Sequence, residues 1–491
     1  MVDARVGHGY AVPGRDVVPP LPVATMRRPR PHSALACREP VAKIRFPFFY
    51  FRHVSDESEE KLDKLLDPFD PEVIARSNRA ILVGLQRQDD TAAEAQALLD
   101  ELHELVSNVG VEIRGSIIAK LREENPRTLV GSGKLEEIAQ LARDNECGLI
   151  IFDDELTPAQ QRNWEKDAKL RAIDRQEIIL DIFITRAKTR EAVLQVELAA
   201  LQQMLPRLKR LWSHLDRQRG GGTMQRDAGE TQLEMDQRKI RDKIAKVRRD
   251  LAEVVAQRAT QRKQRKRVPL PTFSIVGYTN AGKSSLLNKL TGSEVLAANK
   301  LFATLDPTTR RLALPSGRAL LLTDTVGFVR RLPHRLVEAF KATLEEAVQA
   351  DFLVHVIDLG SPERDKHAET TLQVLTEIGA GDRPVITVLN KADLCDEVER
   401  AQALAAYPDA KLVSTKTGEG LPALLQRLEE CAASRDEHMT LLIPHDQYAM
   451  LSKLHAGATI LNSKALPEGT RVEVYVPTRL QETCRAWAIK E

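Results

Sequence analysis

The sequence contains few cysteines and few aromatic residues, and it has no long apolar run. Its five cysteines, Cys37, Cys147, Cys395, Cys431 and Cys484, lie far apart, without a C-x-x-C pair or a His–Cys cluster. This spacing argues against a zinc site or a disulfide framework and favours a reducing compartment. No run approaches the roughly 18 apolar residues that a membrane helix needs. We therefore expect a cytoplasmic protein, associated at most peripherally with membranes.

The charges are nearly balanced, because 72 Lys and Arg face 70 Asp and Glu for a net charge of +2. The net charge therefore does not indicate a class of binding partner, which must be inferred from local clusters of charge. The 491 residues, 42% hydrophobic but only 4% aromatic, suit helix-rich cores in roughly three or four domains. Residues 1–75 begin with a stretch rich in proline and arginine, which predicts a disordered or extended N-terminal extension. A transit peptide is the alternative, but such peptides avoid acids, and this stretch contains Asp3, Asp16 and Glu39.

Residues 76–185 alternate apolar and helical segments. Strands are expected at 80–84, 111–118, 128–130 and 148–152, and helices at 91–106 and 135–142. The alternation predicts a small parallel α/β domain. The turn at Gly131, Ser132, Gly133 and Lys134 could be an anion nest for a second nucleotide. An ordinary turn between strand and helix is favoured, because the segment is too short for a Walker A loop.

Two leucine-rich series in residues 186–268 repeat at spacings of three and four. They predict an antiparallel helical hairpin with a packed seam and a kink at Pro206. The first series is Leu194, Leu198, Leu201, Leu205, Leu208 and Trp212, and the second is Ile240, Ile244, Val247, Leu251 and Val254.

The hairpin also has two basic features. Its glycine-rich tip, residues 217–231, contains three arginines, and a dense basic run ends the second helix. The tip alone could be a flexible connection, and the basic run alone could be a solvated helix face. Together the two features favour a surface that binds an RNA backbone. The candidate RNA contacts are Arg217, Arg219, Arg226, Arg262, Lys263, Arg265, Lys266 and Arg267.

A glycine loop follows the apolar residues 273–276 and opens into a helix, as a Walker A phosphate loop requires. Its backbone N–H groups can converge on phosphate oxygens, Lys283 can neutralise phosphate charge, and the Ser284 hydroxyl can hold Mg2+. The loop comprises Gly277, Tyr278, Thr279, Asn280, Ala281, Gly282, Lys283 and Ser284.

Four further segments follow in the order of a GTPase. Thr304 is placed to be a second Mg2+ ligand, Asp324 can contact the Mg2+ shell, and the Gly327 N–H can sense the γ-phosphate. Asp393 can accept both N1–H and the exocyclic amine of guanine, so the predicted nucleotide is GTP. The segments are Phe302, Ala303, Thr304, Leu305 and Asp306; Asp324, Thr325, Val326 and Gly327; Asn390, Lys391, Ala392 and Asp393; and Ser414, Thr415 and Lys416.

No catalytic side chain is identified. Phe328 stands where Ras-like enzymes have a water-orienting glutamine, so intrinsic hydrolysis should be slow and must be completed from elsewhere. Lys283, Thr304 and Asn280 would assist at the phosphates. Asn280 resembles the asparagine of GTPases that bind K+ there, although a loop-stabilising asparagine is an equal alternative.

The order of domains and several local motifs resemble the HflX family of ribosome-associated GTPases. The similarity covers roughly residues 76–476, with matches at 131–138, at an expected turn at 158–163, and at 229–234, 277–288, 302–307 and 324–328. The resemblance implies binding to the large ribosomal subunit and its rRNA, splitting or rescue of stalled or stressed ribosomes, and catalytic help from the ribosome. Some members also bind ATP through the N-terminal region. The tip departs from the family pattern by losing a glycine and a proline and gaining Asp227.

We thus expect a GTPase domain at 269–435, ending in a helix at 421–431, and a small α+β domain at 436–491, in a monomer. The smaller domain should have strands at 441–443 and 472–476 around a helix at 448–454. Two other functions stay open. The first is a switch that binds protein effectors through the hairpin, independently of salt. The second is an ATP-driven RNA remodeller, whose ATP turnover would survive Lys283→Ala.

Overall fold

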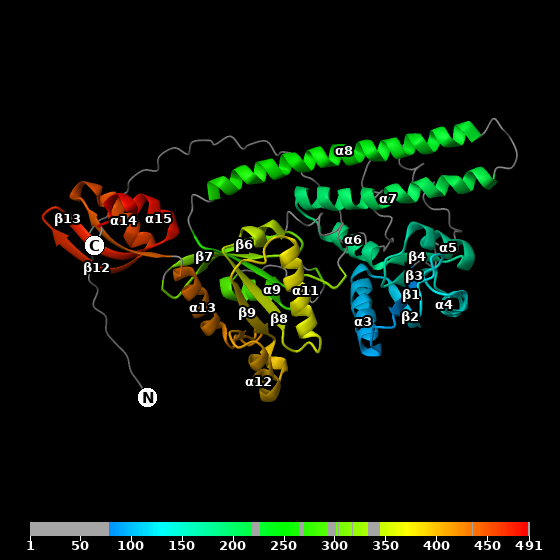
Figure 1. Cartoon of the computed structure of the whole chain (residues 1–491), viewed down its shortest axis with the longest axis horizontal. Coiled ribbons are helices and arrows are strands. Elements are labelled where there is room, and N and C mark those ends of the chain that lie inside the picture. The colour runs from blue at the N-terminus through cyan, green and yellow to red at the C-terminus, as the bar shows by residue number, and fades with distance from the viewer. Residues whose placement is uncertain are drawn as a thin grey trace, which may run out of the picture. The chain divides into compact units, whose positions relative to one another are not determined.

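The computed structural model describes residues 78–218, 226–265, 270–292, 301–302, 304–316, 318–331, 344–434 and 436–489 (Figure 1). The expected extension at 1–75 lies outside these residues and stays a prediction, as do the boundaries of the five regions. Among the described residues, no helix combines the length and the apolar character needed to cross a bilayer.

The first domain is built on a parallel sheet in the order β2-β1-β3-β4. Its strands are β1 (Arg79–Gln86), β2 (Glu112–Lys120), β3 (Leu149–Phe152) and β4 (Arg171–Asp174). The central strand β1 is buried along almost its whole length. The helices are α3 (Ala92–Val109), α4 (Ser132–Asp144), α5 (Pro158–Ala168) and α6 (Arg175–Arg186). The predicted parallel α/β domain is confirmed.

Three details of this domain differ from the prediction. Residues 128–130 form no strand, because Leu129 has φ 68° and makes only an isolated bridge with Asn125. The apolar composition of this segment instead reflects burial of the turn before α4. The expected turn at 158–163 is the start of α5, which Thr157 caps. Strand β4 and helix α6 were not predicted, because the charged residues Arg171, Asp174 and Arg175 interrupt the apolar pattern although all three are buried.

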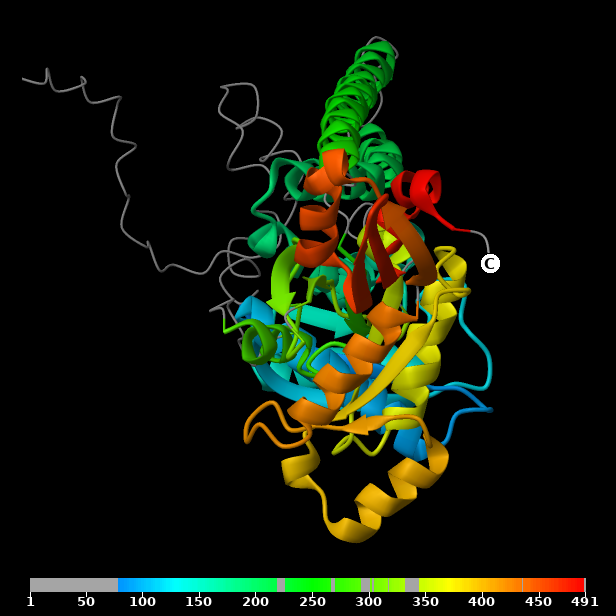
Figure 2. The same ribbon diagram turned by 90° about the vertical axis from the view of Figure 1, so that its left-hand side faces the viewer.

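The predicted antiparallel hairpin is present as α7 (Arg190–Gln218) and α8 (Arg226–Arg265), which lie side by side in both views (Figures 1 and 2). The seam forms as expected among Leu194, Leu201, Ile240, Ile244 and Val247, flanked by Leu198, Leu205, Leu251 and Val254. The side chains of Leu208 and Trp212 lie outside the described part. Helix α7 continues through Pro206. Because α8 already begins at Arg226, the connection is shorter than the predicted tip, and residues 219–225 are not described.

The GTPase domain has a six-stranded sheet in the order β10-β9-β8-β5-β7-β6, in which only the β6–β7 pair is antiparallel. The strands are β5 (Thr272–Gly277), β6 (Thr308–Ala313), β7 (Ala319–Asp324), β8 (Phe352–Asp358), β9 (Val385–Asn390) and β10 (Lys411–Leu412). The main helices are α9 (Lys283–Thr291), α11 (Arg364–Glu377), α12 (Glu397–Ala406) and α13 (Leu421–Ala433). The carboxyl ends of β5, β7 and β9 bring the predicted motifs together.

The C-terminal domain is a three-stranded antiparallel sheet in the order β11-β13-β12. It comprises β11 (Glu437–Ile443), α14 (Tyr448–Gly457), β12 (Thr459–Leu466), β13 (Gly469–Val476) and α15 (Thr478–Cys484). The predicted α+β class is confirmed, although β12 and α15 were missed. Strand β12 is exposed along most of its described length, which removes the apolar alternation that would mark a strand.

Candidate nucleotide-binding site

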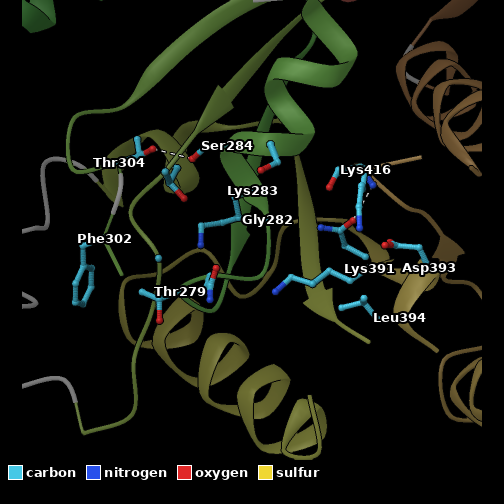
Figure 3. A pocket seen from close by; sticks show the side chains of 16 residues that line it. Thr279, Gly282, Lys283, Ser284, Phe302, Thr304, Lys391, Asp393, Leu394 and Lys416 are labelled. Carbon is cyan, nitrogen blue, oxygen red and sulfur yellow. Dashed lines mark hydrogen bonds between the residues drawn. The ribbon is translucent and has the colours of Figure 1, made fainter. Parts of the chain in front are cut away.

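A cavity of about 340 Å³ opens where the phosphate loop, the end of β9 and the loop after β10 meet (Figure 3). Fourteen of the residues predicted to bind the nucleotide line it. They are Thr279, Asn280, Gly282, Lys283, Ser284, Phe302, Thr304, Thr325, Gly327, Asn390, Lys391, Asp393, Thr415 and Lys416. Ser285 and Leu394 also line it and were not predicted, although each directly follows a predicted motif.

The shape of the phosphate loop depends on its glycines. Gly282 has φ 95°, and a Cβ there would lie 2.2 Å from Nδ2 of Asn390. That amide nitrogen donates a 2.8 Å hydrogen bond to the Ala281 carbonyl, while Asn390 Oδ1 accepts one of 3.2 Å from the Thr415 N–H. Asn390 therefore fastens the phosphate loop to the loop that bounds the base pocket.

Lys283 is buried beneath the phosphate loop. Its Nζ donates to the carbonyl oxygens of Gly277 at 3.1 Å and Tyr278 at 2.7 Å. Burial lowers the pKa of Lys283 to about 8, and the nearby Asp324 opposes this shift. The loop thus holds a poorly solvated cation, which would interact strongly with phosphate oxygens.

Three oxygen-bearing side chains converge beside Lys283. The Ser284 hydroxyl lies 2.8 Å from the Thr304 hydroxyl and donates a 2.6 Å hydrogen bond to Oδ2 of Asp324. Burial raises the pKa of Asp324, opposed by Ser284, Lys283 and Thr304. Its Oδ1 is buried without a hydrogen-bond partner within the described part of the chain. Hard oxygen donors around a buried carboxylate fit Mg2+. Ser284 and Thr304 would hold the ion, with Asp324 behind them, and the ion would neutralise phosphate charge.

The base end of the cavity is organised around Asp393. Its Oδ1 accepts a 2.6 Å hydrogen bond from the Ser414 hydroxyl, and this bond keeps the pKa of Asp393 below its usual range. Ser414 is buried and does not line the cavity, so it acts through Asp393. Lys391 is held by Asp358 at 2.8 Å and extends along the cavity wall. An ionised, oriented carboxylate can accept both hydrogen bonds from the guanine edge.

Several predicted binding residues do not line the cavity, although they belong to the motifs. These are Gly277, Tyr278, Ala281, Leu305, Asp306, Asp324, Val326, Ala392 and Ser414. Ala303 lies outside the described residues. Two of these side chains bind other parts of the chain. Asp306 directs its carboxylate to the start of α7, where Lys188 and Thr189 donate to it. Tyr278 directs its hydroxyl to Glu101 of α3. Both assignments were made from motif position, which does not fix the direction of a side chain.

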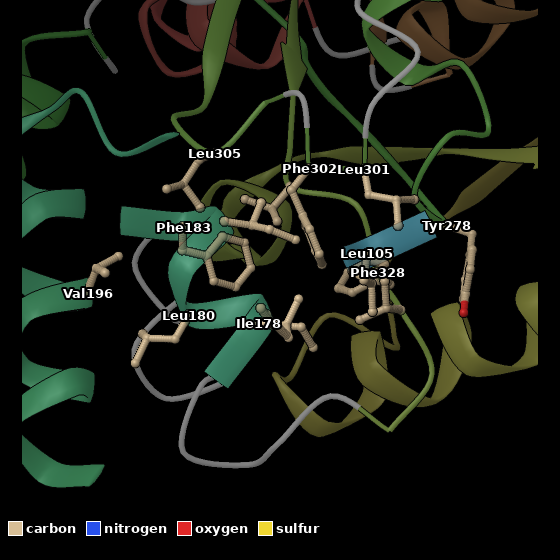
Figure 4. Packing of buried hydrophobic residues seen from close by; sticks show 14 of the residues in the cluster. Leu105, Ile178, Leu180, Phe183, Val196, Tyr278, Leu301, Phe302, Leu305 and Phe328 are labelled. Atoms are coloured by element: carbon tan, nitrogen blue, oxygen red, sulfur yellow. The ribbon is translucent and has the colours of Figure 1, made fainter. Parts of the chain in front are cut away.

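Phe328 also points away from the phosphates. Its N–H donates to Gly277 O at 3.1 Å, and its carbonyl accepts from the Thr279 N–H at 2.8 Å, so its backbone lies against the phosphate loop. The side chain is only 1% exposed and packs in the cluster that contains Leu105 and Ile178 of the first domain (Figure 4). Position 328 therefore contributes no polar group to the cavity, and no catalytic side chain has been identified.

The first domain reaches the mouth of the cavity, which sequence reasoning did not anticipate. Asn280 adopts φ 62° and its Nδ2 lies 3.4 Å from Oε1 of Glu104 on α3. Burial and Glu101 raise the pKa of Glu104. No local motif marks Glu104, because its place depends on how two domains pack.

Five of the eight candidate RNA contacts lie on the two hairpin helices. Arg217, Arg226, Arg262, Lys263 and Arg265 lie in α7 or α8 with side chains outside the described part, and Arg219, Lys266 and Arg267 are not described. On α8, the described side chains of Arg238, Lys239, Arg241, Lys246, Arg248 and Arg249 are exposed, beside the exposed acids Asp242 and Glu253. The described part of α8 therefore presents a mainly basic surface.

Comparisons with known proteins match nearly the whole described chain. Family models described as GTP-binding GTPase N-terminal, GTP-binding GTPase middle region and 50S ribosome-binding GTPase match residues 96–184, 186–265 and 272–391. A GTPase HflX from Akkermansia muciniphila is 50% identical over 419 residues, which cover 83% of this chain and 95% of the relative. The GTPase HflX of Escherichia coli K12 is 42% identical over 379 residues, which cover 77% and 88%. A crystal structure of SsGBP with GDP covers 72% of this chain and 98% of its own at 25% identity and a TM-score of 0.43.

Proposed function

Because this chain belongs to the HflX family of GTPases, we propose that it uses GTP hydrolysis to split or rescue ribosomes through the large ribosomal subunit. The observation that carries the proposal is a basic helical hairpin joined to a GTPase site in one chain. The description of the model that matches residues 272–391, a 50S ribosome-binding GTPase, supports the same partner.

The exposed side of α8 supports binding to rRNA. Six described basic side chains, from Arg238 to Arg249, are exposed on less than four turns of helix. Lys and Arg at such density bind phosphates with a strong dependence on salt, because binding releases counterions. The tip and the end of α8 carry the remaining predicted contacts.

The partner would also complete the catalytic machinery. Phe328 is buried in the core, so its side chain cannot orient an attacking water. The ribosome would supply or order the missing group, so hydrolysis should be slow in its absence. Asn280 at the mouth of the cavity could in addition hold K+, which would act at the phosphates as an arginine finger does.

The test measures GTP hydrolysis with and without purified large subunits, in K+ and in Na+ buffer. We expect strong stimulation by the subunits and loss of all turnover in Lys283→Ala. A preference for K+ would assign an ion to Asn280, and equal rates in both buffers would leave it a structural residue. Light scattering of intact ribosomes then reports whether they dissociate when GTP is present.

Charge reversal on α8 tests the docking surface. The double variant Arg248→Glu/Arg249→Glu should lose most subunit stimulation while keeping its rate without subunits, because both side chains are exposed on α8. The matched control is Lys120→Glu/Arg122→Glu, which reverses two exposed charges on the first domain. A rate that subunits leave unchanged in the unaltered protein would overturn the proposal and favour a switch for protein effectors. ATP turnover that persists in Lys283→Ala would favour the remodeller.

A further inference from the structure

Asp306 joins the GTPase domain to the hairpin. Its Oδ2 accepts hydrogen bonds from the N–H groups of Lys188 and Thr189, both at 3.1 Å, and its Oδ1 accepts from the Thr189 hydroxyl. Thr189 immediately precedes α7, and its hydroxyl in turn accepts from the Ala192 N–H at 3.3 Å. One carboxylate therefore holds the N-terminal end of the first hairpin helix, where negative charge is favourable.

The chain on both sides of Thr304 is held by contacts with other domains, on one side with α6 of the first domain and on the other with the start of the hairpin. On one side, Phe302 packs edge-on against Phe183 of α6, with ring centres 4.6 Å apart. On the other, Leu305 belongs to the same buried cluster as Phe183 (Figure 4), and Asp306 accepts the hydrogen bond from the Thr189 N–H. Thr304 lies between these anchors.

The anchored segment places the Thr304 hydroxyl 2.8 Å from Ser284, within the group of oxygens that fits Mg2+. Thr304 is a ligand that such a site gains when the γ-phosphate is present, whereas Ser284 serves in both nucleotide states. Contacts that keep Thr304 beside Ser284 should therefore favour the GTP-bound state of the protein over the GDP-bound state.

We infer that Asp306 is a positioning residue for GTP hydrolysis, which holds Thr304 at the Mg2+ site by binding the start of α7. A purely structural cap of α7 would account for the hydrogen bonds, but it would not distinguish between GTP and GDP. The inference concerns the nucleotide site itself and does not require the ribosomal partner. It also makes the base of the hairpin part of the nucleotide switch.

The first test compares Asp306→Asn with the unaltered protein in the absence of ribosomes. An asparagine is uncharged and has one acceptor oxygen instead of two, so the charge-assisted hydrogen bonds to Lys188 and Thr189 are weakened. We expect the Mg2+ concentration needed for half-maximal GTP hydrolysis to rise about tenfold, because Thr304 is no longer held in place. Binding of GDP should change less than about twofold. Equal losses of affinity for GTP and GDP, or an unchanged Mg2+ dependence of hydrolysis, would overturn the inference.

A second pair of variants keeps the test independent of the folding of Asp306→Asn. Thr189→Val should shift the Mg2+ dependence in the same direction. Thr189→Ser should keep the Mg2+ dependence of the unaltered protein, because the hydroxyl remains. The matched control is Thr157→Val, which removes a threonine cap from α5 within the first domain. If Thr157→Val shifts the Mg2+ dependence as much as Thr189→Val, loss of a helix cap explains the effect and the inference fails.

Hydrogen exchange gives a direct readout of the same contact. The amides of Lys188 and Thr189 donate to Asp306, so they should exchange more slowly with a non-hydrolysable GTP analogue and Mg2+ than with GDP. Asp306→Asn should abolish that difference. Equal exchange in both nucleotide states of the unaltered protein would show that the contact does not respond to the nucleotide.

Discussion

The hydroxyl of Tyr278 donates a 2.7 Å hydrogen bond to Glu101, which joins the phosphate loop to helix α3 of the first domain. Glu101 also pairs with Arg175 at 2.7 Å and with Arg330 at 3.2 Å. The Arg330 N–H donates in turn to the Tyr278 hydroxyl, and the Tyr278 ring stacks on His367 at 3.7 Å. The phosphate loop and the chain after Phe328 are therefore held by one nearly buried carboxylate.

Removal of this carboxylate should destabilise the protein strongly. The side chain of Arg175 is only 3% exposed, and without Glu101 it keeps Asp153 as a partner but loses half of its charge compensation. We expect Glu101→Ala to lower the free energy of unfolding by about 3–5 kcal/mol, the range for breaking a buried ion pair. The measurement is denaturant unfolding followed by circular dichroism.

An exposed ion pair provides the control for this variant. Glu136 pairs with Arg143 at 2.7 Å on the surface of α4, where both side chains are exposed to solvent. Glu136→Ala should therefore cost less than about 1 kcal/mol. If both variants lose the same stability, the buried network around Glu101 contributes no more than a surface pair.

The nucleotide site could be predicted from the sequence because its binding residues lie in short, contiguous motifs. The loop from Gly277 to Ser284 lies between a strand and a helix, and the motifs that begin at Asp324 and Asn390 start at the ends of two further strands of the same sheet. Parallel strands bring their carboxyl ends to one edge, so the order of the motifs suffices to assemble the site. The hairpin seam was predictable for a similar reason, because heptad spacing defines one helix face.

Contacts between domains were not predictable in this way. Asp306 and Tyr278 belong to nucleotide motifs, yet their side chains bind Thr189 and Glu101, which are more than a hundred residues away. Buried charges also concealed local structure, since Arg171 and Asp174 bound β4 and are nevertheless inaccessible. A sequence pattern assigns charged residues to the surface, whereas here Asp174 lies in the interior and accepts hydrogen bonds from the N–H groups of Leu156 and Glu177.

Nucleotide binding should take up a proton near pH 8. The pKa of Lys283 in the free protein is lowered to about 8 by burial, and bound phosphates would raise it by favouring the charged amine. Affinity for GTP should therefore fall as the pH rises above about 8 and stay nearly constant below pH 7. Calorimetry at pH 8.5 in two buffers of different ionisation enthalpy measures the proton uptake directly.

Lys283→Gln serves as the control, because it has no amine to protonate. Its weaker binding should show no proton uptake over the same range. Uptake that persists in this variant would assign the proton to another group, and a pH-independent affinity of the unaltered protein would contradict the lowered pKa.

Asp393→Asn should change the base preference from guanine to xanthine. The Asp393 carboxylate, oriented by Ser414, can accept two hydrogen bonds, whereas an asparagine accepts one and donates one. Xanthine has a carbonyl where guanine has its exocyclic amine, so it matches the amide. Affinity for GDP should fall about a hundredfold or more, since hydrogen bonds to charged groups contribute about 1.5–3 kcal/mol each. Fluorescent GDP and XDP analogues measure the exchange of preference.

Ser414→Ala separates orientation from recognition at the same carboxylate. It keeps both acceptor oxygens of Asp393 but removes the hydroxyl 2.6 Å away. GDP binding should weaken moderately and XDP binding should not improve. A gain for XDP in this variant would mean that the pocket does not read the base through Asp393.

Phe328→Gln should not create a faster GTPase, although it restores the residue type found at this position in Ras-like enzymes. The Phe328 side chain is 1% exposed and lies in the core cluster shared with Leu105, on the side away from the cavity. A glutamine there would bury an amide and remove aromatic packing, at a cost of about 2–4 kcal/mol. Single-turnover hydrolysis without subunits should stay at the intrinsic rate. Phe328→Leu, which keeps an apolar side chain, should be the more stable variant at the same rate. An acceleration of tenfold or more in Phe328→Gln alone would show that residue 328 can turn into the nucleotide cavity.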